Sequence, residues 1–185
     1  MNQSTPFLTL LDQYLALFPE EQTTVARVRD LVQTHPDAFE RTCTVGHITG
    51  SAWIVAADRQ HCLLTHHRKL ERWLQLGGHV DGEQQVHLAA LREAQEESGM
   101  ADFTFVEIDG QLLPFDIDIH PIPARPKEPA HAHYDLRYLL IATADQPLQI
   151  SAESKDLRWF TWAEIEQMTT EESIRRMVRK AKQLL

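Results

Sequence analysis

The sequence predicts an α+β fold in which a mixed β-sheet is flanked by helices and preceded by a helical extension. Three observations support this prediction. Apolar residues recur at helical spacing through residues 6–35. From residue 42 onward, short apolar segments alternate with turn residues, as in strands joined by hairpins. Helical spacing then returns in residues 84–98 and again after Trp162, so helices and strands are mixed along the chain.

The helical extension is assigned to residues 1–40 and the main domain to residues 41–185. Within the extension, Pro19 should end a first helix, and the His35-Pro36 pair should end a second. We expect this helical pair to form the interface of a homodimer.

The main domain is expected to begin with strands at residues 45–57 and 61–66, separated by a turn at 58–60. A short strand at residues 73–76 should stop at the Gly77-Gly78 pair. Further strands are predicted at 103–108, 111–120, 131–143 and 157–160. Asp116 and Asp118 are expected on an exposed sheet face. The basic residues of the last helix, residues 173–185, are expected on a solvated face rather than at a polyanion site.

Composition excludes several classes of protein. The formal net charge of -9 argues against a general nucleic-acid binder, which needs a basic surface. No stretch of about 18 apolar residues occurs, so we expect no membrane span. The two cysteines, Cys43 and Cys62, cannot build a disulfide framework or a cysteine-based zinc motif. No signal peptide is recognised at the N-terminus, and a reducing cytoplasm is the expected location.

The helix at residues 84–98 carries carboxylates where an apolar stripe is expected. With about 100° per residue, Glu93 and Glu97 share the stripe of Val86 and Ala90, and Glu96 lies beside it. Like charges at these spacings repel one another unless a cation lies between them. Magnesium and manganese prefer such oxygen ligands. A solvated acidic helix end, with Arg92 paired to Glu96, is the alternative.

The surrounding residues resemble a known family signature. Residues 77–100 read GGHVDGEQQVHLAALREAQEESGM, and the window from Gly78 to Met100 resembles the Nudix box. Arg92, Glu93, Glu96 and the residues after them fall in register with Gly78. The resemblance covers roughly residues 43–185 and implies a Nudix-type α/β/α sandwich. One position departs from it, because the box expects Glu where this chain has Gln84.

The resemblance implies a hydrolase that cleaves a diphosphate linkage by attack of water on phosphorus. The expected reaction converts a nucleoside diphosphate derivative, NDP-X, to NMP and P-X. Mg²⁺ is the expected cofactor, and Mn²⁺ is an alternative. A small-molecule nucleoside diphosphate is the expected partner. A non-catalytic nucleotide-binding or sensor module on the same fold is an alternative. An isopentenyl diphosphate isomerase is disfavoured, since neither cysteine has the expected sequence context.

The resemblance also suggests roles for particular residues. The expected metal ligands are the Gly77 carbonyl and the side chains of Glu93, Glu96 and Glu97. Glu93 and Glu153 are the two candidates for the general base, with Glu153 favoured because it lies in a loop that can move. Glu83 is expected to brace Arg92 in place of the missing glutamate, and the Gln84 amide is the alternative brace.

Polar residues outside the box are candidates for substrate binding. They are His67, Arg68, Lys69, His133 and Asp135. A solvated turn is the alternative for residues 67–69. On the strand at 131–143, His131, His133, Asp135 and Arg137 alternate. Together with His66, His67 and His79 they could form a zinc site, but a strand that lines the substrate is favoured because no cysteine supports zinc.

Overall fold

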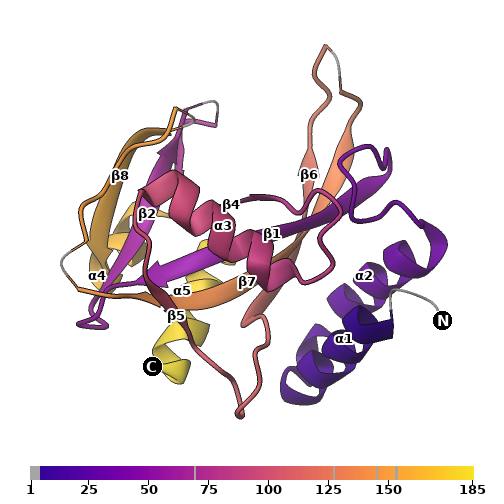
Figure 1. The fold of residues 1–185 in the computed structure, drawn as a ribbon, viewed down its shortest axis with the longest axis horizontal. Coiled ribbons are helices and arrows are strands. Elements are labelled where there is room, and N and C mark those ends of the chain that lie inside the picture. The colour runs from indigo at the N-terminus through magenta and orange to yellow at the C-terminus, as the bar shows by residue number, and fades with distance from the viewer. Residues whose placement is uncertain (1–4, 69, 127, 145, 153) are drawn as a thin grey trace.

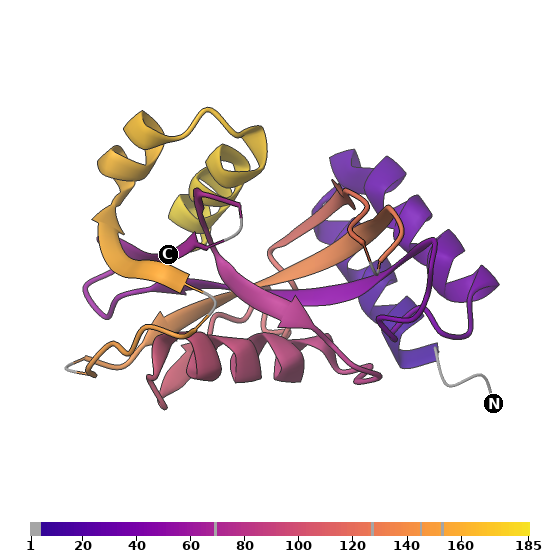
Figure 2. The same ribbon diagram turned by 90° about the horizontal axis from the view of Figure 1, so that it is seen from above.

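The structure, a computed structural model, describes residues 5–68, 70–126, 128–144, 146–152 and 154–185. Over these residues the chain forms a mixed β-sheet with helices on both faces and a helical pair at one end (Figure 1). Seen from above, the sheet lies between α3 and the C-terminal helices (Figure 2). The predicted α+β sandwich is therefore confirmed.

The centre of the sheet is a long parallel pair of strands. β1 (Gly46–Val55) runs beside β7 (His131–Ala142), in register from Gly46↔Ala132 to Val55↔Ile141. The other described strands pair antiparallel, with β2 and β4 on β1, β5 and β6 on β7, and β3 and β8 on β2. Their bounds are β2 (His61–His67), β3 (Arg72–Leu74), β4 (Leu76–His79), β5 (Phe103–Phe105), β6 (Asp116–Ile122) and β8 (Ser154–Thr161).

Alternate residues of β1 supply the two cores of the sandwich. Ile48, Ala52 and Ile54 pack into one core, which includes the buried residues of α3 (Val86–Ser98). Trp53 and Val55 point to the opposite face and pack into a second core. The second core is covered by α4 (Trp162–Met168) and α5 (Glu172–Leu184). Because β1 is covered on both faces, it is buried along its whole length.

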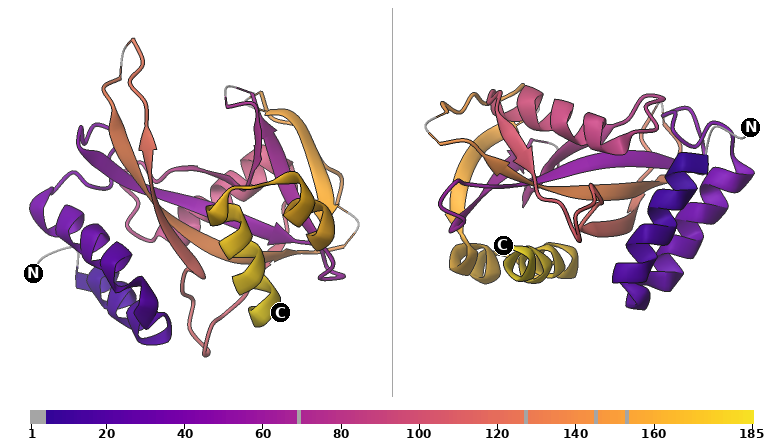
Figure 3. Two further views of the ribbon diagram at one scale, coloured as in Figure 1. Left: turned by 180° about the vertical axis from the view of Figure 1, so that it is seen from behind. Right: turned by 60° about the horizontal axis from the view of Figure 1, so that its bottom comes forward.

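The N-terminal helices are α1 (Thr5–Leu17) and α2 (Gln22–Thr34), joined by the short 3-10 helix η1 (Pro19–Glu21). They lie side by side at the end of the sheet (Figure 3), where Tyr14 of α1 contacts Lys180 of α5. Phe7, Leu11 and Tyr14 of α1 are buried in the same core as Ile48 of β1. The extension therefore packs against the sheet and shares its core.

Several strand boundaries differ from the predicted ones. The Gly77-Gly78 pair does not end a strand, because β4 passes through both glycines and pairs with β1. Glycine has no side chain to pack, so its strand pairing was not visible in the residue pattern. β8 begins at Ser154, earlier than the predicted 157–160, and β6 occupies Asp116–Ile122 within and beyond the predicted 111–120.

A buried ionic network corrects the prediction that Asp116 and Asp118 lie on an exposed face. Asp116 is fully buried. Its carboxylate contacts Arg137 Nη1 at 3.0 Å, Arg176 Nε at 2.7 Å and Lys180 Nζ at 3.1 Å. Arg176 Nη2 also donates to Asp118 at 2.9 Å. Polar and apolar residues alternate along β6 as predicted. However, α5 covers the face that carries Asp116 and Asp118, which the sequence analysis assigned to solvent.

The same network corrects the prediction of a fully solvated basic face on α5. Lys180 is buried and donates to the Tyr14 hydroxyl at 3.0 Å, and it also pairs with Glu21. Arg179, by contrast, is mostly exposed. One side of the basic run thus ties α5 to the N-terminal helices. Within the part of the chain that the structure describes, no helix is both long and apolar enough to cross a bilayer.

Candidate active site

Two glycines bring α3 against the sheet. A Cβ at Gly50 of β1 would lie 2.9 Å from the Val86 carbonyl oxygen at the start of α3. A Cβ at Gly78 of β4 would lie 2.7 Å from the carboxyl carbon of Glu93. The contact at position 50 is with the backbone of α3, so glycine is required there, whereas a side chain at position 78 would displace the Glu93 carboxylate. The close approach places the glutamates of α3 beside β4.

The three predicted glutamate ligands lie on α3 as the periodicity predicted. Glu97 Oε2 accepts a hydrogen bond from the Gly77 N–H at 3.0 Å. Glu93 is mostly buried at 17% side-chain exposure, whereas Glu96 is 64% exposed. α3 ends at Gly99, whose φ of 72° is the left-handed conformation of a helix C-terminus. The helix therefore holds Glu93 and Glu97 toward β4 and leaves Glu96 toward solvent.

Arg92 connects α3 to β4. Its Nη2 donates to the His79 carbonyl at 2.6 Å and to Glu93 Oε1 at 2.9 Å. Glu83 lies just before α3, where its carboxylate accepts from the backbone N–H of Gln85 at 2.7 Å. This contact satisfies one of the donors at the helix start. The brace between Glu83 and Arg92 stays a prediction.

A cleft of about 850 Å³ opens beside these residues. This size suits a small-molecule ligand, since such pockets are typically about 300–1,000 Å³. Gly77, Glu93, Glu96 and Glu97 all line it. The oxygen donors predicted for a metal therefore share one cavity. Carboxylates and a carbonyl oxygen are the ligands that Mg²⁺ and Mn²⁺ prefer, so this donor set fits the cofactor that the sequence predicts.

The predicted substrate-binding residues separate into two groups. His67, His133 and Asp135 line the cleft. Arg68 instead donates through Nε to the Ala152 carbonyl at 3.2 Å and through Nη2 to the Ser154 carbonyl at 3.0 Å. It thereby fastens the loop before β8 to the end of β2. Lys69 and Glu153 lie outside the described residues.

Asp135 is fully enclosed by hydrogen-bond donors. It accepts from Thr49 Oγ1 at 3.0 Å, Ser51 Oγ at 2.7 Å and Arg137 Nε at 2.9 Å, and from Gln75 Nε2 at 3.3 Å. Burial is the largest single influence and raises the pKa of this carboxyl, but Arg137, His120 and the Ser51 hydroxyl together hold the pKa below its ordinary value. Asp135 is therefore an ionised, fixed group in the floor of the cleft.

The cleft also contains residues that the sequence reasoning missed. Arg41 pairs bidentately with Asp81, at 2.8 and 2.7 Å, on the wall beside His79. Thr49 and Ser51 line the cleft from β1, and with the buried His47 they are polar residues at alternate positions of an otherwise apolar strand. That alternation was the available signal. It was hidden because residues 45–57 were taken together as one buried apolar segment.

Comparison with known proteins places this geometry in a family. The family model described as the NUDIX domain matches residues 47–181, well over half of the chain. A Nudix-family hydrolase from Clostridium perfringens is 26% identical, with 75% of this chain and 98% of that chain covered and a TM-score of 0.59. No protein of curated function matches the sequence.

Two more distant structures share the fold. The Ap4A hydrolase of C. elegans is 17% identical, over 74% of this chain and 95% of that chain, with a TM-score of 0.57. The dihydroneopterin triphosphate pyrophosphohydrolase of E. coli is 16% identical, over 72% of this chain and 92% of that chain, with a TM-score of 0.55. The predicted class of enzyme is confirmed at the level of the family: the chain belongs to the Nudix family of hydrolases.

Proposed function

We propose that this Nudix hydrolase cleaves the diphosphate linkage of a nucleoside diphosphate derivative, NDP-X, to NMP and P-X. The observation that carries the proposal is the set of oxygen donors, from Gly77 and the glutamates of α3, in one cleft large enough for a nucleotide. The Nudix domain of Shewanella oneidensis NrtR, which has this fold at 18% identity and a TM-score of 0.50, is complexed with ADP ribose. That compound is a nucleoside diphosphate derivative.

In this proposal Glu93, Glu96 and Glu97, with the Gly77 carbonyl, hold Mg²⁺, and Mn²⁺ is an alternative. Bound Mg²⁺ supplies Lewis-acid stabilisation of the negative charge on the phosphates. The chain's own residues position the reactants. Arg92 fixes α3 against β4, and His67 and His133 offer ring nitrogens to the substrate from the cleft wall.

In the reaction, a water oxygen bonds to phosphorus as the bridging P–O bond breaks. The water proton passes to a general base, and P-X leaves. We propose Glu153 as that base, with Glu93 as the alternative. Ser151, two residues before Glu153, lines the cleft. Arg68 donates to the carbonyls of Ala152 and Ser154, the two neighbours of Glu153 in the chain. Glu93 already accepts a hydrogen bond from Arg92.

Turnover of a diphosphate panel with Mg²⁺ tests the proposed function. The panel contains ADP-ribose, nucleotide sugars, dinucleoside polyphosphates, coenzymes and nucleoside triphosphates. We expect phosphate to be released after phosphatase coupling, oxygen from labelled water in one product, and loss of activity on chelation. Binding of panel compounds without any product would contradict hydrolysis and favour the nucleotide-binding module.

Two glutamine variants test the base. Glu153→Gln is expected to lower turnover by about 100-fold or more with little change in the Mg²⁺ dependence, since a base removes a proton without holding the cation. Glu93→Gln is expected to be partly rescued by excess Mg²⁺, as a lost ligand would be. Near wild-type turnover of Glu153→Gln, measured at several Mg²⁺ concentrations, would transfer the role of base to Glu93.

Three expectations from the sequence are kept as proposals. They are the division into an extension at residues 1–40 and a Nudix domain at 41–185, the homodimer, and the cytoplasmic location. The family match, which begins at residue 47, supports the division.

A further inference from the structure

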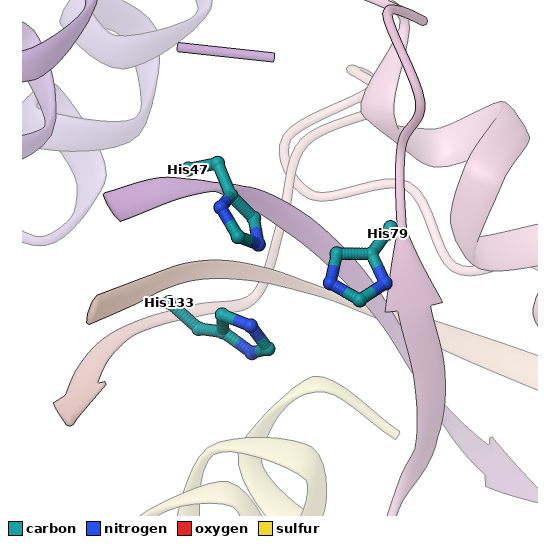
Figure 4. Close-up of side chains that lie close together, drawn as sticks. All are labelled: His47, His79 and His133. Atoms are coloured by element: carbon teal, nitrogen blue, oxygen red, sulfur yellow. The ribbon is translucent and has the colours of Figure 1, made fainter. Parts of the chain in front are cut away.

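Three histidines outside the carboxylate donor set converge beside the cleft. His47 lies on β1, His79 on β4 and His133 on β7. Figure 4 shows their rings pointing toward one another. One ring nitrogen from each lies within 4.8 Å of the others. His79 and His133 line the cleft, and His47 is buried beneath them at 1% exposure.

Strand register explains the convergence. His47 pairs directly with His133 across the parallel strands β1 and β7. His79 pairs with Thr49, which projects from the same face of β1 as His47 because the two are two residues apart. Side chains at paired positions have Cβ atoms only about 5 Å apart. The three imidazoles therefore come from three neighbouring strands that fix them in place.

The ring nitrogens of this cluster lack ordinary partners. Among the described residues, neither ring nitrogen of His47 has a hydrogen-bond partner of acceptable distance and angle, and Nε2 of His79 also has none. A buried polar group without a partner destabilises the fold, because it has lost its hydrogen bonds to water and gained none in return. A ligand that accepts electron pairs from these nitrogens would remove part of that destabilisation.

The environment also keeps the rings in the form that binds metals. Burial, reinforced by the imidazole of His79, lowers the pKa of His47 to about 4, although the Cys43 carbonyl acts in the opposite direction. Burial and the neighbouring imidazoles of His120 and His47 lower the pKa of His133 to about 3. These two rings are therefore neutral near pH 7, and a neutral imidazole has the free lone pair that coordination requires.

We propose that His47, His79 and His133 bind a divalent metal ion that prefers nitrogen ligands, with Zn²⁺ as the expected ion. Imidazole nitrogen suits zinc and its neighbours in the transition series, whereas magnesium prefers oxygen. Nitrogens on one tetrahedral zinc, each bound at about 2.0–2.1 Å, lie about 3.4 Å apart, so small side-chain rotations close the site. Three protein ligands would leave a fourth position for a water or a substrate oxygen.

This site goes beyond the proposed hydrolysis and differs in ligand chemistry from the carboxylate site. It also differs from the zinc grouping considered from the sequence. His66 of that grouping packs on Trp73, with ring centroids 5.1 Å apart, and His47 was absent from it. The alternation along β1 marks His47 as polar, but its position beside His133 follows from strand pairing, which the sequence alone does not reveal.

Zinc binding to the full chain tests the proposal without any substrate. The metal-free protein is titrated with Zn²⁺ in saturating Mg²⁺, against a chromophoric chelator. We expect one Zn²⁺ per chain, and Co²⁺ in its place should give the visible absorption of a tetrahedral site. His79→Gln and His133→Gln should each weaken Zn²⁺ binding by about 100-fold or more, since losing even a second-shell partner costs about 10–100-fold.

Two control variants locate the zinc. His61→Gln removes an imidazole outside the cleft, and Glu97→Gln removes a carboxylate of α3; both should keep wild-type Zn²⁺ affinity. His47→Gln should also abolish Zn²⁺ binding. If this variant fails to fold, the Zn²⁺ affinities of His79→Gln and His133→Gln test the proposal. No Zn²⁺ bound in the presence of Mg²⁺, or binding lost in Glu97→Gln but kept in both histidine variants, overturns the proposal. Neither outcome depends on turnover, so the proposed hydrolysis stands or fails separately.

Discussion

Glu97→Gln is expected to lower turnover by about a thousand-fold while leaving the protein folded. A metal ion contributes several kcal/mol of transition-state stabilisation, and each 1.36 kcal/mol is about tenfold in rate. The amide of glutamine has no charge with which to hold Mg²⁺. Its carbonyl oxygen can nevertheless accept the hydrogen bond from the Gly77 N–H that Glu97 Oε2 accepts at 3.0 Å, so the contact between α3 and β4 is kept.

The measurement is kcat across a Mg²⁺ titration, with thermal unfolding followed in parallel. Glu107→Gln is the matched control, since Glu107 is exposed and outside the cleft, and it should retain wild-type turnover. A Glu97→Gln enzyme that turns over normally at limiting Mg²⁺ would exclude Glu97 as a ligand. Loss of activity together with a large fall in unfolding temperature would assign Glu97 a structural role instead.

The helix of the site was predictable because local chemistry determines it. The spacing of Val86, Ala90 and Ala94 sets the buried stripe of α3, and Gly99 ends the helix in the left-handed conformation. The facing of Glu93 and Glu97 follows from the same periodicity. These features depend on neighbours along the chain, which a sequence displays directly.

The rest of the site depends on which strands become neighbours. Asp135 is enclosed by Thr49, Ser51 and Gln75, which are 60 to 86 residues away in the chain. Nothing in residues 131–143 alone specifies that β1 will pair with β7 in parallel. Likewise, the burial of Asp116 depends on α5, whose basic side was taken as solvated because periodicity marks a polar face without saying what it meets.

Arg137→Met is expected to lower the free energy of unfolding by about 3–5 kcal/mol near neutral pH. Arg137 is buried at 3% side-chain exposure and contacts three carboxylates, those of Asp135, Asp116 and Asp118, at 2.9, 3.0 and 3.2 Å. Methionine retains apolar bulk but removes the charge. Asp116 keeps Arg176 as a partner, but Asp135 would be left with the neutral donors around it as a buried anion.

The pH dependence of this loss separates a charge effect from a packing effect. In the native protein burial raises the pKa of Asp135, but Arg137, with His120 and the Ser51 hydroxyl, keeps that pKa below its ordinary value. The stability from this carboxylate is therefore fully present above about pH 4, the unfolded pKa, and is lost as pH falls through the lower folded pKa. Without Arg137, burial is opposed only by His120 and the neutral donors, so we expect the folded pKa of Asp135 to rise above the unfolded one. The loss of unfolding free energy in Arg137→Met should then be smaller at about pH 5 than at about pH 7, because Asp135 takes up a proton as the pH falls.

Urea unfolding of both proteins at the two pH values measures the effect. Arg179→Met is the control on the exposed side of α5, where the ion pair with Glu172 is solvated and its loss should cost less than about 1 kcal/mol. A penalty for Arg137→Met that is equal at both pH values would identify lost packing as its cause. A penalty that grows on acidification would contradict the assignment of Asp135 as the stranded anion, because protonation of a buried, unpaired carboxylate can only relieve it.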